Sequence, residues 1–145
     1  MINNETIDQM TRRSVRFRKL TDNGDNRGFS YKASKEALAF SQKIVDLHIV
    51  SIVPGAIRGN HFHIDRNEVI YVIYQSQWLF VYDEGENSTV RNHEITGSGC
   101  IEIAVSANCA HAIKNTGRKD LLIFAASNGK YDPDLPCTRR RVVVE

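Results

Sequence analysis

Residues 54–68 read PGAIRGNHFHIDRNE and place two histidines, His61 and His63, two positions apart, with Glu68 five positions later. In an extended strand, the side chains of residues i and i+2 point to the same face, so both imidazoles would be directed at one spot. The polar residues 64–67 favour a turn that would bring Glu68 to the same place. Two imidazoles and a carboxylate suit a divalent first-row metal such as zinc, iron, manganese or nickel.

The rest of the chain provides a β-rich setting for this stretch. Between residues 43 and 127 we expect about eight short strands separated by turn residues, at the spacing that is typical of an all-β sandwich or barrel. The expected strands are residues 44–53, 59–63, 68–74, 78–82, 89–95, 100–105, 110–115 and 121–126. The first of them, IVDLHIVSIV, is nearly all apolar and predicts a buried strand. Several strands are apolar on both faces, which favours a second covering sheet or another subunit, and hence a homodimer.

The two ends of the chain carry weaker signals. Residues 14–20, SVRFRKL, alternate as a strand does, and residues 34–40 predict a short helix with Ser34 as its N-cap. The tail, residues 131–145, predicts a closing strand or a docked arm. We therefore expect a single domain over residues 1–145, with an N-terminal extension (1–42, including a short arm or helix), a barrel (43–127) and a C-terminal arm (128–145).

Composition excludes several classes of function. A chain of 145 residues with a net charge of +2 is long enough for one packed domain and too weakly charged to indicate a nucleic-acid or membrane partner. The cysteines, Cys100, Cys109 and Cys137, have no metal-type spacing, which favours free thiols in a reducing compartment. Neither a signal-type N-terminus nor an apolar run of about 18 residues occurs, so we expect a cytoplasmic protein.

A third histidine, His111, lies about 45 residues beyond the first pair, in another expected strand. By alternation it shares a face with Ile113 and Asn115, and if that face is the interior one, His111 reaches the same spot as the pair. Three histidines and one glutamate leave open coordination positions, as catalytic metal sites require. The other two histidines, His48 and His93, have no such company, and we interpret both as structural.

Two stretches resemble the motifs of the cupin superfamily. Residues 55–68 are similar to its first motif, with His61-x-His63-x4-Glu68, and residues 97–115 are similar to its second, with His111-x3-Asn115. The usual glycine is replaced near Gln75, and Ser106 and Asn108 occupy the usual proline and glycine of the second motif; these changes alter loops and leave every ligand in place. The resemblance implies a double-stranded β-helix (a jelly-roll β-barrel) with a metal at its mouth, held by His61, His63, Glu68 and His111.

A finer resemblance concerns residues 58–63, RGNHFH. They are similar to the RGxHxH stretch of cupins that act on nucleotide-linked keto-sugars: capsule-type sugar 3-epimerases, ketoisomerases and the dTDP-4-dehydrorhamnose 3,5-epimerase group. Residues 127–133 and 136–138 resemble the tail of the capsule-type epimerases, and residues 25–28 a substrate-side loop. The resemblance implies a nucleotide-linked 4-keto-6-deoxy-sugar epimerase or isomerase. Ketoisomerases often carry glutamine at the carboxylate position and need no metal, so Glu68 favours a metal-bound version.

Such a reaction removes a proton next to a carbonyl and stabilises the resulting enolate. A metal or Arg58 would stabilise the oxyanion, although Arg58 differs in parity from His61 and reaches the site only if Gly59 bends the chain. A metal-bound histidine cannot also act as the base. The candidates for proton transfer are therefore Tyr74, which shares a face with Glu68, and Tyr131 in a loop, with Tyr82 and Asp132 as further possibilities.

Two other functions use the same residues. An iron-dependent cupin dioxygenase has a site of three histidines and one carboxylate with open positions for oxygen and substrate. A non-catalytic cupin would only bind a small molecule in its pocket. All three hypotheses place a small-molecule ligand in the pocket, and residue patterns alone do not separate them.

Overall fold

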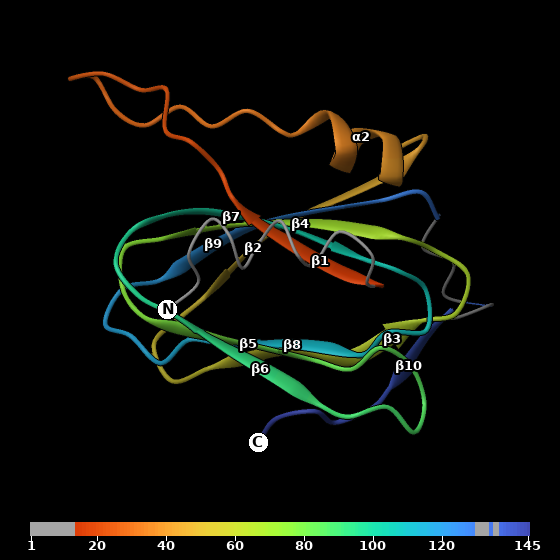
Figure 1. Cartoon of the computed structure of the whole chain (residues 1–145). Helices are drawn as coiled ribbons and strands as arrows, with labels where there is room; N and C mark the ends of the chain where they lie inside the picture. The colour runs from red at the N-terminus through yellow and green to blue at the C-terminus, as the bar shows by residue number, and fades with distance from the viewer. Residues whose placement is uncertain (1–13, 130–133, 135–136) are drawn as a thin grey trace.

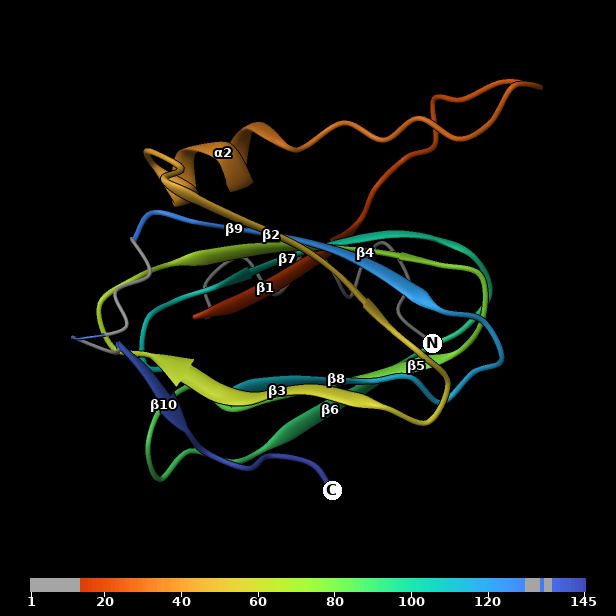
Figure 2. The ribbon, with the colours of Figure 1, turned by 180° about the vertical axis from the view of Figure 1, so that it is seen from behind.

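The computed structural model describes residues 14–129, 134 and 137–145. Its strands form two antiparallel five-stranded sheets that face each other (Figures 1 and 2). The first sheet has the order β1-β7-β4-β9-β2 and the second the order β10-β3-β8-β5-β6. The elements are β1 (Val15–Lys19), α2 (Lys35–Ser41), β2 (Asp46–Ile52), β3 (Ile57–His63), β4 (Glu68–Tyr74), β5 (Trp78–Tyr82), β6 (Arg91–Ile95), β7 (Gly99–Val105), β8 (His111–Lys114), β9 (Leu121–Ser127) and β10 (Thr138–Arg140).

This arrangement is a jelly roll, which confirms the predicted all-β class. The alternation of apolar residues located the strands of the expected barrel region well, and β4 and β5 have the predicted bounds. Within the described residues, no strand pair joins the two sheets into a closed ring. Strand β1, which we placed in an N-terminal extension, belongs to the first sheet as an edge strand paired with β7. No helix in the described part of the chain has the length and apolarity of a membrane span.

Helix α2 lies on the outer face of the first sheet (Figure 1). Ser34 is its N-cap, as predicted, and the Ser34 hydroxyl accepts a hydrogen bond of 3.0 Å from the backbone N–H of Ala37. The backbone N–H and hydroxyl of Ser34 donate to the buried carboxylate of Glu102 on β7, at 2.8 and 2.5 Å. These contacts fasten the start of the helix to the centre of the sheet.

Half of the space between the sheets is filled with aromatic rings. Phe17 on β1 packs against Phe80 on β5 and against His93 on β6, with ring centroids 6.2 and 4.5 Å apart, and Tyr82 stacks on Phe80 at 5.3 Å. His93 is thus a packed residue of this half, in agreement with its structural interpretation. The polar side chains gather in the other half, between β2 and β9 of the first sheet and β3 of the second.

Strand β2 differs from its prediction. It is an edge strand rather than a buried one, and the outward side chains of Leu47 and Ile49 are 56% and 60% exposed. Its inward side chains are Asp46, His48 and Val50. An apolar run predicts a strand that is covered on both faces, but among the described residues only the inner face is covered.

Candidate active site

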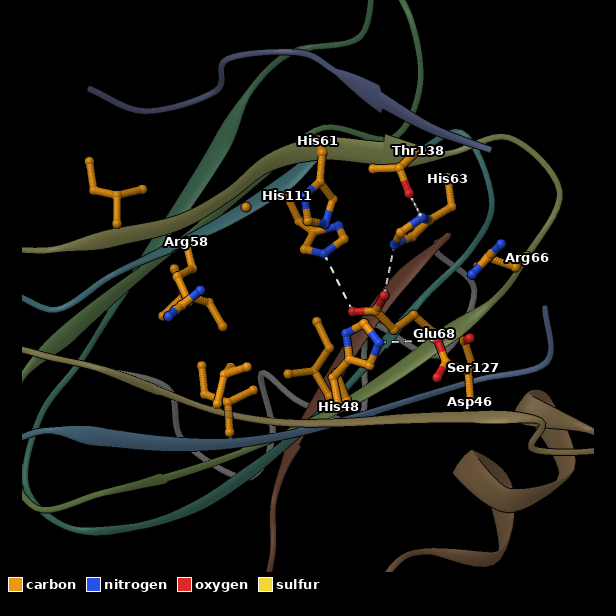
Figure 3. Close-up of a pocket in the computed structure, with 17 residues that line it drawn as sticks. Asp46, His48, Arg58, His61, His63, Arg66, Glu68, His111, Ser127 and Thr138 are labelled. Carbon is orange, nitrogen blue, oxygen red and sulfur yellow. Dashed lines mark hydrogen bonds and ion pairs between the residues drawn. The ribbon is translucent and has the colours of Figure 1, made fainter. Parts of the chain in front are cut away.

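A cavity of about 460 Å³ opens between β2, β4 and β9 of the first sheet and β3, β8 and β10 of the second (Figure 3). Its walls carry four histidines, two arginines and two carboxylates, together with apolar side chains deeper in the sandwich. All four predicted metal ligands, His61, His63, Glu68 and His111, line it. The structure therefore brings together residues from three strands that are separated by up to 50 positions in sequence.

A β-bulge in β3 decides which side chains face this cavity. Gly59 pairs with Ala112 and His61 pairs with His111, so Asn60 is an extra residue in the strand. The bulge shifts the alternation by one, and Arg58 therefore lines the cavity on the same face as His61. Gly59 has φ +108°, and a Cβ there would lie 2.5 Å from the carbonyl oxygen of His111. The bend at Gly59, without which Arg58 was not expected to reach the site, is therefore present.

The Arg58 side chain is held in place by the preceding strand. Its Nε donates a hydrogen bond of 2.9 Å to the carbonyl oxygen of Ser51 on β2. The terminal NH₂ groups of a guanidinium held in this way are left to bind an anion.

The rings of the three histidines form a cluster on the second sheet. The His61 ring lies 5.1 Å from that of His63 and 5.0 Å from that of His111, measured between centroids, and the His63 and His111 rings are 6.3 Å apart. Glu68, the first residue of β4, reaches across from the other sheet (Figure 3). Its Oε2 lies 2.8 Å from His63 Nε2, and its Oε1 lies 3.6 Å from His111 Nε2.

These contacts set the charge of the site. Burial by itself would raise the pKa of Glu68, but His111 and His63 outweigh it and hold the pKa well below its usual range. Burial, with His111 and His63 nearby, lowers the pKa of His61 to about 4, although Glu68 opposes this. At neutral pH the cluster therefore contains an ionised carboxylate and a neutral imidazole, the forms in which both groups bind metals.

The outward nitrogens of two rings have partners of their own. His63 Nδ1 lies 3.0 Å from the hydroxyl of Thr138 on β10, and His111 Nδ1 lies 3.4 Å from the carbonyl oxygen of Cys109. A carbonyl only accepts, so His111 Nδ1 is the donor, and in the neutral ring the lone pair of Nε2 then faces the Glu68 carboxylate. The lone pair of Nε2 and the carboxylate repel each other unless a positive charge lies between them. A proton or a metal cation would supply that charge. The donor set therefore fits a divalent cation in its chemistry.

The positions of these side chains are those of a hydrogen-bonded cluster. Among the residues that the structure describes, no three histidine, cysteine or carboxylate side chains form a group that could hold a metal ion as they stand. Glu68 lies between His63 and His111 and occupies the space between them. Coordination by all four residues would require the carboxylate to leave its hydrogen bond with His63.

The structure does not bring Tyr74 or Tyr82 to this cavity. Tyr74 shares a face with Glu68, as predicted, but it ends β4 about 20 Å further along at ~3.3 Å per residue. It is buried, and its ring packs on Trp78 at a centroid distance of 5.7 Å. Tyr82 is fully buried in the aromatic half of the core. Tyr131 and Asp132 lie outside the described residues.

Sequence reasoning missed part of the site. Asp46 and His48 on β2 line the cavity opposite the histidine cluster, and Arg66 lines it from the turn before Glu68 (Figure 3). Asp46 and His48 follow the same i, i+2 spacing as His61 and His63, which was the available signal. His48, which we interpreted as structural from the sequence, thus lines the cavity.

The sequence profile of the polysaccharide biosynthesis C-terminal domain family matches residues 21–139. The chain belongs to this family. The match includes both sheets, apart from β1 and the end of β10, and every residue of the cavity. Among curated proteins, no sequence matches the domain.

Solved structures show where the domain's fold recurs. The capsular polysaccharide assembling protein CapF from Staphylococcus aureus matches 86% of the chain at a TM-score of 0.62 and 21% identity, and the chain covers 34% of CapF, about a third of its length. The dTDP-6-deoxy-D-glucose-3,5-epimerase RmlC from Legionella pneumophila (TM-score 0.69, 15% identity) matches 88% of the chain and 72% of its own. The sugar 3,4-ketoisomerase QdtA from Thermoanaerobacterium thermosaccharolyticum (TM-score 0.65, 13% identity) matches 88% of the chain, and the match covers 88% of QdtA. The domain therefore has the cupin fold of nucleotide-sugar epimerases and ketoisomerases.

Proposed function

We propose that the protein transfers a proton at the carbon beside the ketone of a nucleotide-linked 4-keto-6-deoxy sugar, as an epimerase or isomerase. The observation that carries the proposal is the cavity itself, in which Arg58 and the His63–Glu68–His111 cluster face the same space. The names of RmlC and QdtA, one an epimerase and the other a ketoisomerase of sugars, are in keeping with this chemistry.

In the proposed reaction, a base removes the proton from the carbon next to the carbonyl. The electron pair of the C–H bond becomes the second bond of an enolate, and the carbonyl oxygen takes the negative charge. Arg58 is a fixed cation at the cavity wall and would stabilise that oxygen. An acid then returns a proton to the same carbon from the other face in an epimerase, or to a neighbouring position in an isomerase.

We propose also that the cluster binds a divalent first-row metal. His61, His63, Glu68 and His111 would hold it, and as a Lewis acid the cation would share with Arg58 the charge of the enolate oxygen. The support is chemical: a neutral imidazole, an ionised carboxylate, and outward nitrogens oriented by Thr138 and by the Cys109 carbonyl. Equilibrium dialysis of the protein against Zn²⁺, Fe²⁺, Mn²⁺ and Ni²⁺ tests this, and we expect one bound ion per chain that His61→Ala removes.

We propose that two copies associate through β2, which would form the predicted homodimer. One edge of this strand has no partner strand within the described residues. Its outer face carries the exposed Leu47 and Ile49, and the exposed Val53 follows the end of the strand. Antiparallel pairing of β2 with its own copy is self-complementary and would close a two-fold dimer. We expect Ile49→Glu to yield monomers in light scattering, whereas Val142→Glu, at an exposed apolar position in the tail, should leave the dimer intact.

Incubation in deuterium oxide tests the reaction directly. With a panel of dTDP- and UDP-linked 4-keto-6-deoxyhexoses, we expect deuterium to enter the carbon beside the ketone of at least one substrate. Glu68→Gln should slow this exchange by about 100-fold or more, because a neutral amide lacks the negative charge that Glu68 gives to the cluster. Glu94→Gln, at an exposed position on β6, is the matched control. Absence of exchange with every substrate would refute the proposed reaction.

A further inference from the structure

The first sheet carries a second imidazole–carboxylate pair in the same cavity. His48 Nε2 lies 3.3 Å from Asp46 Oδ2, and both side chains line the cavity from β2 (Figure 3). Asp46 pairs across the sheet with Ser127, which pairs in turn with Glu68. His48 pairs across the sheet with Ala125, which pairs in turn with Ile70. The pair therefore stands two strands from Glu68, on the other side of the cavity from the three-histidine cluster.

The side chain of His48 is open to a ligand. It is 61% exposed, whereas the side chains of His63 and His111 are 11% and 4% exposed. Its Nε2 lies beside the Asp46 carboxylate, so Nδ1 is the nitrogen that can contact a molecule in the cavity. An imidazole can act as a general base, and the Asp46 carboxylate beside Nε2 orients the ring.

The other groups of the cavity are committed to different tasks. With the proposed metal bound, the three histidines and Glu68 of the cluster are its ligands and cannot also transfer the substrate proton. Arg58 and Arg66 carry guanidinium groups, which have hydrogen-bond donors and no acceptor. Among the cavity-lining residues that the structure describes, Asp46 and His48 are the remaining pair that can exchange a proton with a substrate.

We propose that His48 is the catalytic residue that removes the substrate proton, and that Asp46 is the residue that positions it. This inference rests on the proposed proton transfer next to a ketone, and it names the group that performs it. His48 Nδ1 accepts the proton as the C–H electron pair moves into the enolate, and Arg58 faces the developing charge. The imidazolium formed beside Asp46 then holds the proton until it is returned to carbon or exchanged with solvent.

Exchange kinetics in the full-length protein test the assignment. We expect His48→Gln to lower the rate of deuterium incorporation at saturating substrate by about 100-fold or more, with KM changed less than about three-fold. Asp46→Asn should lower it about ten-fold, and added imidazole should restore part of the activity of His48→Ala. The control is Glu94→Gln, with circular dichroism and bound-metal content measured for every variant.

The outcomes separate this inference from the proposed function. If the unchanged protein exchanges deuterium and His48→Gln does so at the same rate, His48 is not the base, while the proposed reaction stands. If His48→Gln loses activity only through a raised KM, or together with its fold, the assignment is also wrong. If the unchanged protein catalyses no exchange with any substrate, the proposed function fails and the role of His48 falls with it.

A second readout does not depend on turnover. Trypsin cleavage after Lys43 and Arg58 releases residues 44–58, in which His48 is the single histidine. Diethyl pyrocarbonate labelling of this peptide therefore reports on His48 alone. We expect bound dTDP-glucose or UDP-glucose to reduce the labelling at least five-fold. Binding of either molecule, measured by calorimetry, without protection of this peptide would place the ligand away from His48 and overturn the assignment.

Discussion

His61 and His111 are direct cross-strand partners in the β3–β8 pair, with ring centroids 5.0 Å apart and ring planes at 85°. This pairing exists because one residue, Asn60, is looped out as a bulge immediately before His61. Without the bulge, His61 and Arg58 would lie on opposite faces of β3. The geometry of the site thus depends on two residues, Gly59 and Asn60, that do no chemistry themselves.

Substitution of Gly59 tests the bulge. In Gly59→Ala the new Cβ would lie 2.5 Å from the His111 carbonyl oxygen and 2.8 Å from Ala112 Cα, at a positive φ. We expect a loss of about 2–4 kcal/mol in the free energy of unfolding, measured by urea denaturation. Gly55→Ala is the matched control, since Gly55 also has a positive φ but nothing lies near its absent Cβ, and it should lose only about 1 kcal/mol. Equal losses in the two variants would contradict this account.

Asn60 fastens the C-terminal tail over the bulge. Its Oδ1 accepts hydrogen bonds from the backbone N–H groups of Val143 and Val144, at 2.9 and 3.1 Å, and its Nδ2 donates to the Val144 carbonyl at 2.9 Å. Asn60→Ala removes all three bonds and should cost about 1–3 kcal/mol, with faster hydrogen exchange at both valine amides. Asn60→Asp keeps the acceptor and should retain most of the stability. If the aspartate variant were as unstable as the alanine variant, the acceptor bonds would not be the cause.

Thr138 should tune metal affinity without touching the metal. Its hydroxyl lies 3.0 Å from His63 Nδ1 and orients that ring. We expect Thr138→Val, which keeps the shape and removes the hydroxyl, to weaken binding of the preferred metal by about 10–100-fold in competition with a chelating dye. Thr89→Val, in an exposed loop, is the control. Unchanged affinity in Thr138→Val would show that the ring needs no such partner.

His61 should make the metal-free protein sensitive to mild acid. Its folded-state pKa of about 4 lies below its ordinary value of 6.5, so the unfolded chain binds the proton first as the pH falls. Stability should therefore decline between about pH 6.5 and 4, by on the order of 1 kcal/mol at pH 5 after allowance for the partial exposure of the ring. Urea denaturation in the presence of a chelator measures this. His61→Asn should flatten the pH profile in this window, and an unchanged profile would exclude His61 as its cause.

The three free cysteines should differ in reactivity. Burial raises the pKa of Cys100 to about 12 and that of Cys109 to about 11, whereas Cys137 is half-exposed. Because the thiolate is the reactive form, we expect one thiol to react with DTNB at about pH 8 in the native protein and all three to react in urea. Peptide mapping should place the rapid label on Cys137, and Cys137→Ser should abolish it. Rapid labelling of Cys109 in the native protein would be inconsistent with its burial.

Much of the architecture follows from local pattern. Alternating and apolar runs located the strands because a residue's face in a strand depends only on its parity, and Ser34 marked the start of α2 because its side chain satisfies a free N–H. The same alternation predicted that His61, His63, Glu68 and His111 converge, provided that their strands line one common interior. Tyr74 shows the limit of this rule. Alternation correctly assigns Tyr74 to the same face of β4 as Glu68, but it does not show how far apart the two side chains lie along the strand.

Local sequence pattern was sufficient to predict the strands and the paired histidines on β3, and to show that Arg58 reaches the site only if Gly59 bends the chain. What those residues contact could not be predicted, because strand order and register depend on contacts between residues far apart in the chain. The β3–β8 register creates the bulge that turns Arg58 inward. The β2–β9–β4 register places Asp46 and His48 on the cavity wall, and it leaves the apolar outer face of β2 uncovered.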